Sequence, residues 1–237
     1  AIINAGFARV VYGARDPNPK HVGAAEAILQ AAEITVEKEV CAYECDQLIR
    51  AFTKIQETGL PWVILKSAIS LDGCITRPPD ESQWLSSQES REIVHQLRHQ
   101  TDAVITGGNT ARKDNPSLTI RSSGLPNKTQ PWRMIITQGK KEQLPQDLKL
   151  LNDCHKDRTL VQENGDISTA LRKLANLGCN SVLVEAGGTL MASFLKQQLA
   201  DEVVVFYAPI VTGGPDSGFG HNTPGVTLIE PQFTKIG

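Results

Sequence analysis

The sequence lacks the features that mark membrane proteins, disulfide-rich secreted proteins and nucleic-acid-binding proteins. No apolar run approaches the roughly 20 residues of a membrane-spanning helix, and the N-terminus does not have the charged-then-apolar form of a signal peptide. The five cysteines are odd in number and irregularly spaced, which predicts reduced thiols. The formal net charge is −2, without a basic block for nucleic acid or a membrane surface. These absences favour a cytoplasmic protein with small-molecule ligands.

The chain is long enough for one large α/β domain with a small appendage. Its 237 residues are 40% hydrophobic, which is sufficient for a core. A helix predicted over 43–57 ends at Thr58-Gly59-Leu60-Pro61, because Gly suits the position after a helix and Pro cannot continue it. We therefore predict a main domain over 60–237 and a small α/β segment over 1–59, which is too short to bury a core by itself.

Residues 181–190 predict a ligand site. Val182, Leu183 and Val184 form an apolar run typical of a buried strand, and Glu185 follows at its carboxyl end, where open α/β sheets bind ligands. Gly187 and Gly188 leave room at the N-terminus of a predicted helix, whose free N–H groups and dipole favour phosphate. The alternative is an ordinary strand-to-helix turn with a solvated glutamate.

Other loops repeat this pattern. Gly107-Gly108 and Gly213-Gly214 also follow predicted strands, so we expect three loops to converge on one extended ligand. Lys66 lies within the apolar strand predicted over 62–69. Because an unpaired buried charge is costly, its side chain must either extend along its aliphatic stem to the end of the sheet or face an anion in a cleft. Residues 111–116 predict a turn and 117–121 a strand.

A helix is predicted to begin at the capping box Ser86-x-x-Glu89. His95 and His99 on this helix have the i, i+4 spacing of metal ligands. No third ligand is evident, so we expect an ordinary pair of helix side chains and no metal site.

The common nucleotide fingerprints G-x-G-x-x-G and G-x-x-x-x-G-K-[ST] are absent. Six motifs in order instead resemble the reductase domain of the bifunctional riboflavin-biosynthesis deaminase-reductase. They are Pro61-Trp62-Val63-Ile64-Leu65-Lys66, Ser70-Leu71-Asp72-Gly73, Glu81-Ser82-Gln83-Trp84, Gly107-x-x-Thr110, Asp114-Asn115-Pro116-x-Leu118-Thr119-x-Arg121 and Val184-Glu185-Ala186-Gly187-Gly188. The resemblance implies a dihydrofolate-reductase-like fold, with a mixed, mostly parallel sheet flanked by helices.

The first segment resembles the C-terminal end of the zinc deaminase domain that precedes this reductase. The matching residues are Ala1-Ile2-Ile3, Gly6-x-x-Arg9-Val10-Val11 and Asp16-Pro17-Asn18-Pro19. The H-x-E and P-C-x-x-C motifs that hold the deaminase zinc are absent from this sequence. Residues 1–59 are thus expected to be a remnant of that domain without a zinc site, and whether a longer parent chain carries an active deaminase stays open.

The resemblance implies NADPH-dependent reduction of the ribosyl chain of 5-amino-6-(5-phosphoribosylamino)uracil to a ribityl chain. The implied substrate contacts are Ser82, Arg98, Leu118, Arg121 and Glu185, with the two arginines on the 5′-phosphate and Glu185 on the pyrimidine. The implied cofactor contacts are Ala68, Trp84, Thr110, Asp114, Gly187, Gly188, Thr189, Leu190, Met191, Ala192 and Ser193. Lys66 and Asp114 are expected to manage proton or charge near the reacting carbon, although both could instead orient ribose hydroxyls.

Two other functions stay open at this point. One is a reductase of the same fold acting on another pterin- or pyrimidine-like substrate, and the other is a catalytically silent nucleotide-binding module. Retention of Arg98, Arg121 and Glu185 favours the phosphorylated pyrimidine. The family also suggests a homodimer, formed through the apolar run at 203–207, while a preference for NADPH over NADH does not follow from the residues alone.

The missing ligand motifs give a first prediction. The purified chain should contain no stoichiometric zinc and should release no ammonia from the diaminopyrimidine precursor, because no residues in it can activate water on a metal. Elemental analysis and an ammonia assay check both points. One tightly bound zinc ion per chain would overturn this interpretation.

Overall fold

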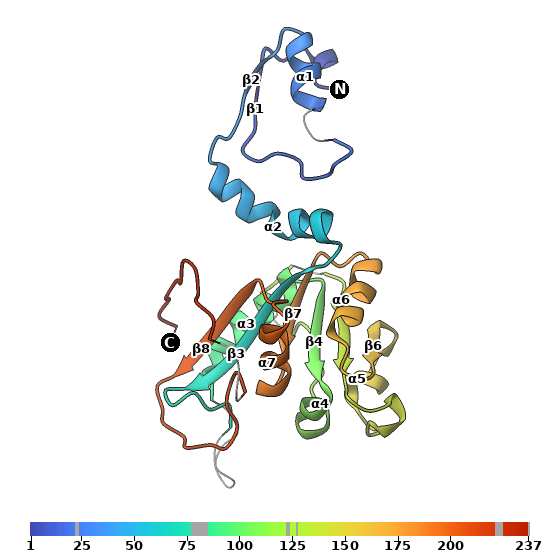
Figure 1. The fold of residues 1–237 in the computed structure, drawn as a ribbon, viewed down its shortest axis with the longest axis vertical. Helices are drawn as coiled ribbons and strands as arrows, with labels where there is room; N and C mark the ends of the chain where they lie inside the picture. Colours follow the sequence, from blue (N-terminus) through green and yellow to red (C-terminus); the bar gives the residue numbers. More distant parts are fainter. Residues whose placement is uncertain (22–23, 77–84, 122–123, 127, 221–224, 237) are drawn as a thin grey trace. The chain divides into compact units, whose positions relative to one another are not determined.

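The computed structural model describes residues 1–21, 24–76, 85–121, 124–126, 128–220 and 225–236. The chain divides into two compact units, Ala1–Trp62 and Val63–Gly237 (Figure 1). This division lies three residues after the boundary that the sequence predicts.

The first unit is small and has little core. Its elements are the 3-10 helix η1 (Ile3–Ala5), the strands β1 (Arg9–Val11) and β2 (Thr35–Glu37), and the helices α1 (Ala24–Ala31) and α2 (Ala42–Thr58). The two strands form a parallel two-stranded sheet. Leu29 and Ile34 are buried, whereas Phe7, Ile28 and Leu48 are exposed. As predicted, α2 ends at Gly59, which has a left-handed φ of 70° and donates its N–H to Ile55 O.

The second unit is built on one six-stranded sheet. Its strands are β3 (Trp62–Ser70), β4 (Ala103–Gly107), β5 (Trp132–Ile136), β6 (Thr159–Gln162), β7 (Ser181–Glu185) and β8 (Glu202–Ala208). Their order is β6-β5-β4-β7-β3-β8. The pairs β6–β5, β5–β4, β4–β7 and β3–β8 are parallel. The α/β sheet with a small N-terminal appendage is confirmed.

The centre of this sheet is fully buried. Ala103–Ile105 of β4 and Val182–Val184 of β7 have no exposed surface, as expected of apolar runs in strands covered on both faces. The covering helices are α3 (Gln88–Gln100), α4 (Gly108–Asp114), α5 (Lys149–Asn152), α6 (Ile167–Asn176) and α7 (Gly188–Lys196), with the 3-10 turns η2 (Lys141–Gln143) and η3 (Lys156–Arg158). Figure 1 shows β4 running directly into α4 at the end of the sheet.

Three local predictions need correction. Helix α3 is capped by Ser87, not Ser86: the Ser87 hydroxyl accepts the N–H of Ser90 because the helix starts one residue later. The turn predicted over 111–116 is mostly helix α4, which continues to Asp114 and ends at Asn115 with a left-handed φ of 40°. Residues 117–121 are not a strand. Their main-chain groups are bonded by side chains instead, as described below.

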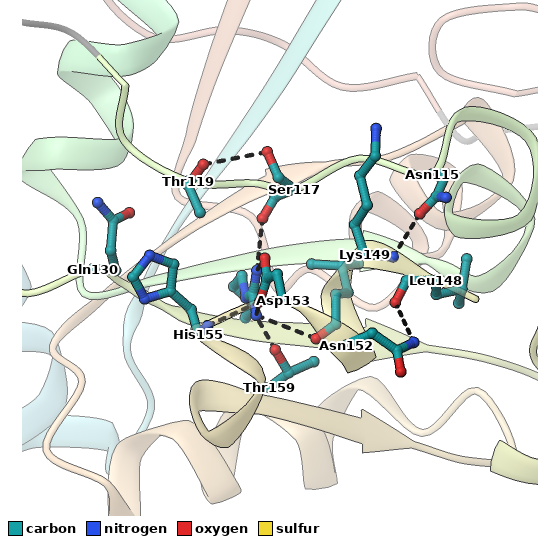
Figure 2. Close-up of polar contacts among 12 residues, drawn as sticks. Asn115, Ser117, Thr119, Gln130, Leu148, Lys149, Asn152, Asp153, His155 and Thr159 are labelled. Carbon is teal, nitrogen blue, oxygen red and sulfur yellow. Dashed lines mark hydrogen bonds and ion pairs between the residues drawn. The ribbon is translucent and has the colours of Figure 1, made fainter. Parts of the chain in front are cut away.

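Arg133 on β5 is a fully buried arginine that forms an ion pair in the sheet. Its side chain is 1% exposed, and all five guanidinium donors are used. They reach Asp153 Oδ1 and Oδ2 at 2.7 and 2.6 Å, Thr159 Oγ1 at 3.0 Å, and the carbonyls of Ser117 and Leu150 at 2.9 and 3.2 Å. Figure 2 shows Ser117, Asp153 and Thr159, three of these partners, close together. The cluster ties β5, β6, α5 and the segment after α4 together.

This pair gives a prediction for acid stability. Hydrogen bonds from Arg133 lower the pKa of Asp153 below its ordinary value of 3.8, and burial opposes them only in part. The stabilisation is therefore complete above pH 3.8 and is lost as the pH falls through the lower folded-state pKa. Asp153→Asn should lower the free energy of unfolding by about 3 kcal/mol at neutral pH, because Arg133 loses its counter-charge.

Urea denaturation between pH 3 and 7 measures this effect. The difference between wild type and Asp153→Asn should shrink toward the acid end. The control is Asp157→Asn, whose carboxylate is on an exposed residue of the same region. Equal effects of the two substitutions would contradict the stabilising role of the pair.

Candidate active site

The candidate site is centred on Glu185, the last residue of β7. β7 lies between β4 and β3 in the sheet, and α7 begins three residues later at Gly188. Glu185 therefore occupies the carboxyl end of a central parallel strand, where α/β folds bind ligands. Its side chain is 13% exposed, so the carboxylate needs a partner inside the protein.

Arg98 on α3 is that partner. Its Nε donates to Glu185 Oε1 at 2.6 Å and its Nη2 to Oε2 at 2.9 Å, which is the bidentate geometry of a strong arginine–carboxylate pair. The third guanidinium nitrogen, Nη1, donates to the carbonyl of Thr119 at 2.9 Å. Burial raises the pKa of Glu185, but the charge and hydrogen bonds of Arg98 outweigh it and hold that pKa below its usual value. Glu185 is thus a buried, ionised acceptor.

Lys66 on β3 forms a charged cluster with Arg98 and Glu185. Its Nζ lies 5.4 Å from the centre of the Phe206 ring, a cation–π distance. Burial lowers the pKa of Lys66, and the nearby Arg98 charge lowers it further, although Glu185 acts in the opposite direction. The sequence-based expectation that Lys66 needs an anion nearby agrees with the Glu185 charge. A lysine with a lowered pKa gives up its proton more readily than a solvated one.

His95, one turn before Arg98, lies on the edge of this cluster. Its Nδ1 accepts the main-chain N–H of Arg121 at 3.3 Å. Burial lowers the pKa of His95, and the charges of Arg98 and Arg121 lower it further. His99 instead bonds the carbonyl of Pro126 through Nε2 at 3.0 Å. The two histidines thus have separate polar partners.

The loops after β7 and β8 and helix α4 meet around Gly187 and Gly188, but the Gly213-Gly214 pair lies against Asp72 and Thr76 instead. Gly187 donates its N–H to Thr110 Oγ1 at 3.1 Å, which joins the loop after β7 to α4. A Cβ on Gly188 would lie 2.1 Å from Ser217 O and 2.5 Å from Gly220 N, in the loop after β8. The room beside Gly188 is therefore filled by protein backbone and not left for a ligand, contrary to expectation. Gly187 is more open: its Cβ would meet only Thr110 Oγ1, at 3.7 Å.

The other predicted residues fall into different environments. Leu118 is 3% exposed and packs in a core cluster with Ala111 and Ile135. Because its side chain is buried, only its main chain could contact the substrate. Arg121 is exposed, and no ion pair to it occurs within the described residues. Asp114 is exposed at the end of α4, where desolvation raises its pKa and Lys113 opposes the change.

Several predicted cofactor contacts are in or near α7. Ala68 is half-buried on β3, Met191 and Ala192 are buried on α7, and the Ser193 hydroxyl donates to Thr189 O. Leu190 lies over Gly107, where a Cβ would meet its Cδ2 at 3.7 Å. Ser82 and Trp84 lie outside the described residues.

Sequence reasoning missed two residues next to this site. Arg133 is a charge inside the apolar strand 132–136, the same signal that identified Lys66. Gln130, just before that strand, bonds both main-chain groups of Ile120, and no sequence signal reveals this.

Two further features concern the described part of the chain. No helix there is long and apolar enough to cross a lipid bilayer. No group of three or more His, Cys, Asp or Glu side chains there could hold a metal ion.

Comparison with known proteins gives a consistent match. The family model of the RibD C-terminal domain matches residues 61–235. The Escherichia coli riboflavin biosynthesis protein RibD is 33% identical over 98% of this chain and 71% of its own length. The solved structure of Acinetobacter baumannii RibD has 30% identity and a TM-score of 0.82, covering 98% of this chain and 69% of its own.

A second solved structure has a more specific name. It is the Thermotoga maritima diaminohydroxyphosphoribosylaminopyrimidine deaminase/5-amino-6-(5-phosphoribosylamino)uracil reductase. It is 26% identical, with a TM-score of 0.81, and the match covers 99% of this chain and 71% of that one.

The contrast between the two glycines gives a prediction. Gly188→Ala should lower the melting temperature by several degrees, because its Cβ would collide with the Ser217 carbonyl and Gly220 backbone. Gly187→Ala should leave the melting temperature nearly unchanged, since φ is −72° and the nearest atom is in ordinary contact. Thermal unfolding of both variants checks this, and equal destabilisation would contradict the packing described here.

Proposed function

The chain belongs to the RibD family, with residues 61–235 as its reductase domain, and we propose that it reduces the ribosyl chain of 5-amino-6-(5-phosphoribosylamino)uracil with NADPH. The observation that carries this proposal is the buried Glu185 carboxylate, kept ionised by Arg98 at the carboxyl end of a central strand. Such an acceptor suits the N–H and amino groups of a pyrimidine. The proposed substrate is the one that appears in the name of the Thermotoga maritima relative.

The reaction defines what the protein must provide. The bond between C1′ and the ring oxygen O4′ breaks, C1′ gains a hydride, and O4′ gains a proton. A bound nicotinamide cofactor supplies the hydride. The chain's own residues must orient the pyrimidine, hold the phosphate, exclude water and deliver one proton.

Glu185 and Arg98 act as a unit in this proposal. Arg98 uses donors on all three of its nitrogens for Glu185 and Thr119, so its first role is to hold the carboxylate in one orientation. Each carboxylate oxygen retains a second lone pair that can accept from the substrate. The expected phosphate contact of Arg98 is therefore limited to the N–H groups that these bonds leave available.

Arg121 is the stronger candidate for the 5′-phosphate. Its side chain is exposed, and its backbone is anchored to His95 within the charged cluster. A guanidinium that is not already paired can bind phosphate through two parallel hydrogen bonds. Ser82 stays a proposed substrate contact from the family resemblance.

The junction between β7 and α7 fits a dinucleotide. The first N–H groups of α7, from Gly188 and Thr189, have no acceptor within the helix, and the helix dipole favours a phosphate there. The open side of Gly187 lets a ligand approach the backbone. Thr110 and Asp114 on α4, Ala68 on β3 and Trp84 remain proposed cofactor contacts. The choice of NADPH over NADH rests on the family resemblance.

Lys66 is the better placed of the two proposed proton donors. It lies in the cluster with Glu185, and its lowered pKa favours proton release. Asp114 has a raised pKa, which favours a protonated carboxyl at higher pH than usual. Among the described residues, however, no hydrogen bond or ion pair joins Asp114 to Glu185, Arg98 or Lys66.

We also propose an origin for the first unit and an assembly state. The two-stranded sheet of residues 1–59 is assigned to the C-terminal end of a deaminase domain without its zinc ligands. A homodimer is proposed through β8, whose Tyr207 is 62% exposed.

Oxidation of NADPH tests the proposed reaction. The full chain should consume NADPH, followed at its absorbance band, only when the enzymatically deaminated pyrimidine is added. NADH serves as the comparison cofactor. Turnover of another pterin or pyrimidine in preference to this substrate would favour a different reductase, and NADPH binding without any turnover would favour a silent module.

Substitution of Glu185 separates the substrate from the cofactor. Glu185→Gln replaces one acceptor oxygen by a donor, so one hydrogen bond to the pyrimidine becomes a donor–donor clash. Loss of a charged partner in a buried site is worth about 1.5–3 kcal/mol, which predicts a fall in kcat/KM of roughly tenfold to a hundredfold. The dissociation constant of NADPH should barely change.

The control for this experiment is Glu142→Gln, an exposed glutamate on η2. Because Glu185→Gln also weakens the partner of Arg98, its unfolding midpoint is measured in parallel. A variant that is folded but has lost NADPH affinity, with substrate affinity retained, would place Glu185 in the cofactor half of the site.

A further inference from the structure

The segment Ser117–Arg121 carries the proposed phosphate ligand Arg121, yet it belongs to no strand or helix. A segment of this kind normally relies on water or a sheet ladder for its main-chain hydrogen bonds. Here side chains from two directions make these bonds. The position of Arg121 therefore depends on side chains outside the segment.

The first direction is the sheet. Ile120 donates its N–H to Gln130 Oε1 at 2.8 Å, and Gln130 Nε2 donates back to Ile120 O at 3.1 Å. This amide thus reproduces the paired hydrogen bonds of a neighbouring strand. Arg133, three residues later, donates to Ser117 O at 2.9 Å and is itself fixed by Asp153. The Ser117 and Thr119 hydroxyls also bond each other at 3.2 Å, as Figure 2 shows.

The second direction is helix α3. Arg98 donates to Thr119 O, and His95 accepts the N–H of Arg121. Since Arg98 also holds Glu185, one guanidinium links the position of the segment to the position of the pyrimidine acceptor. The two ends of the proposed substrate are thereby held at a fixed separation.

Leu118 shows that the segment needs these restraints. Its φ is 52°, a left-handed conformation that is rare for leucine, and its side chain is buried in the core. Such backbone persists only where its surroundings hold it. The buried Leu118 side chain fixes one end of the segment. The bonds from Ile120 to Gln130 and from Arg121 to His95 then limit rotation of these two residues.

We propose that Gln130 is a positioning residue for substrate binding: it holds Ile120 so that the Arg121 guanidinium is directed at the substrate phosphate. This inference rests on the proposed function, because it needs Arg121 to bind the substrate. Gln130 itself is half-buried, and its hydrogen bonds within the described residues are to the main chain of Ile120. Arg133 and Asp153 support the start of the same segment.

A double-mutant cycle with the full chain tests this role. Gln130→Leu removes both bonds to Ile120 and should raise the KM for the phosphorylated pyrimidine about tenfold, with a smaller change in kcat. The dissociation constant of NADPH should stay within twofold. In an Arg121→Ala background the same substitution should add less than twofold to KM, because the group that it positions is gone. Gln96→Leu, at an exposed glutamine on α3, is the matched control.

A second variant keeps the shape of the side chain. Gln130→Glu is isosteric and can accept from Ile120 N, but its ionised carboxylate cannot donate to Ile120 O and repels it. It should raise KM at least as much as Gln130→Leu. A side chain that merely fills space would tolerate this change, so a wild-type KM for a folded Gln130→Glu would overturn the proposal.

The remaining outcomes are distinguishable. Equal effects of Gln130→Leu in the wild-type and Arg121→Ala backgrounds would overturn the positioning role while leaving the proposed function intact. An unchanged substrate KM for Arg121→Ala alone would overturn the phosphate assignment and, with it, the reason for positioning Arg121. A parallel loss of NADPH affinity in both Gln130 variants would show a general structural role instead.

Discussion

A carboxylate that is almost withdrawn from water remains charged only if another charge compensates for its lost hydration. In this chain Arg98 does so for Glu185, and the rest of the site is arranged around the pair. β7 brings the carboxylate to the sheet end, α3 brings the guanidinium, and the carbonyl of Thr119 occupies the remaining nitrogen. Lys66 is placed where both charges act on it. One guanidinium therefore links three elements: β7, α3 and the segment that contains Thr119.

The strand positions of the candidate-site residues could be predicted from the sequence, but the contacts among them could not. Glu185 follows a continuous apolar run, and Lys66 interrupts another, so their places in parallel strands could be deduced from pattern and polarity. The ion pair between Arg98 and Glu185 spans 87 residues. Neither periodicity nor local propensity contains information on such a separation. The pairing depends on how α3 packs against the sheet, which only the tertiary structure specifies.

Two of the wrong predictions have causes in the tertiary structure. Residues 117–121 have strand-forming composition, but Arg98, Gln130 and His95 bond the main chain that a neighbouring strand would have paired. Tertiary contacts thus override propensity there. The sequence predicted room for a ligand beside Gly188, but the backbone of Ser217 and Gly220 occupies that space. A glycine reveals that space is restricted, but it does not reveal what occupies the space.

The backbone contact at Gly188 has a consequence for folding. The loop that packs there follows β8, and β8 is parallel to β3, whose Val63 N–H is bonded to the Asp201 carboxylate 138 residues along the chain. Closing so long a loop is entropically expensive, and contacts of high sequence separation slow folding. The N-terminal end of α7 is consequently completed only after nearly the whole second unit has been synthesised and β8 has docked. A nascent chain can form β4 and β7 beforehand, but the end of α7 that is proposed to bind the cofactor is assembled last.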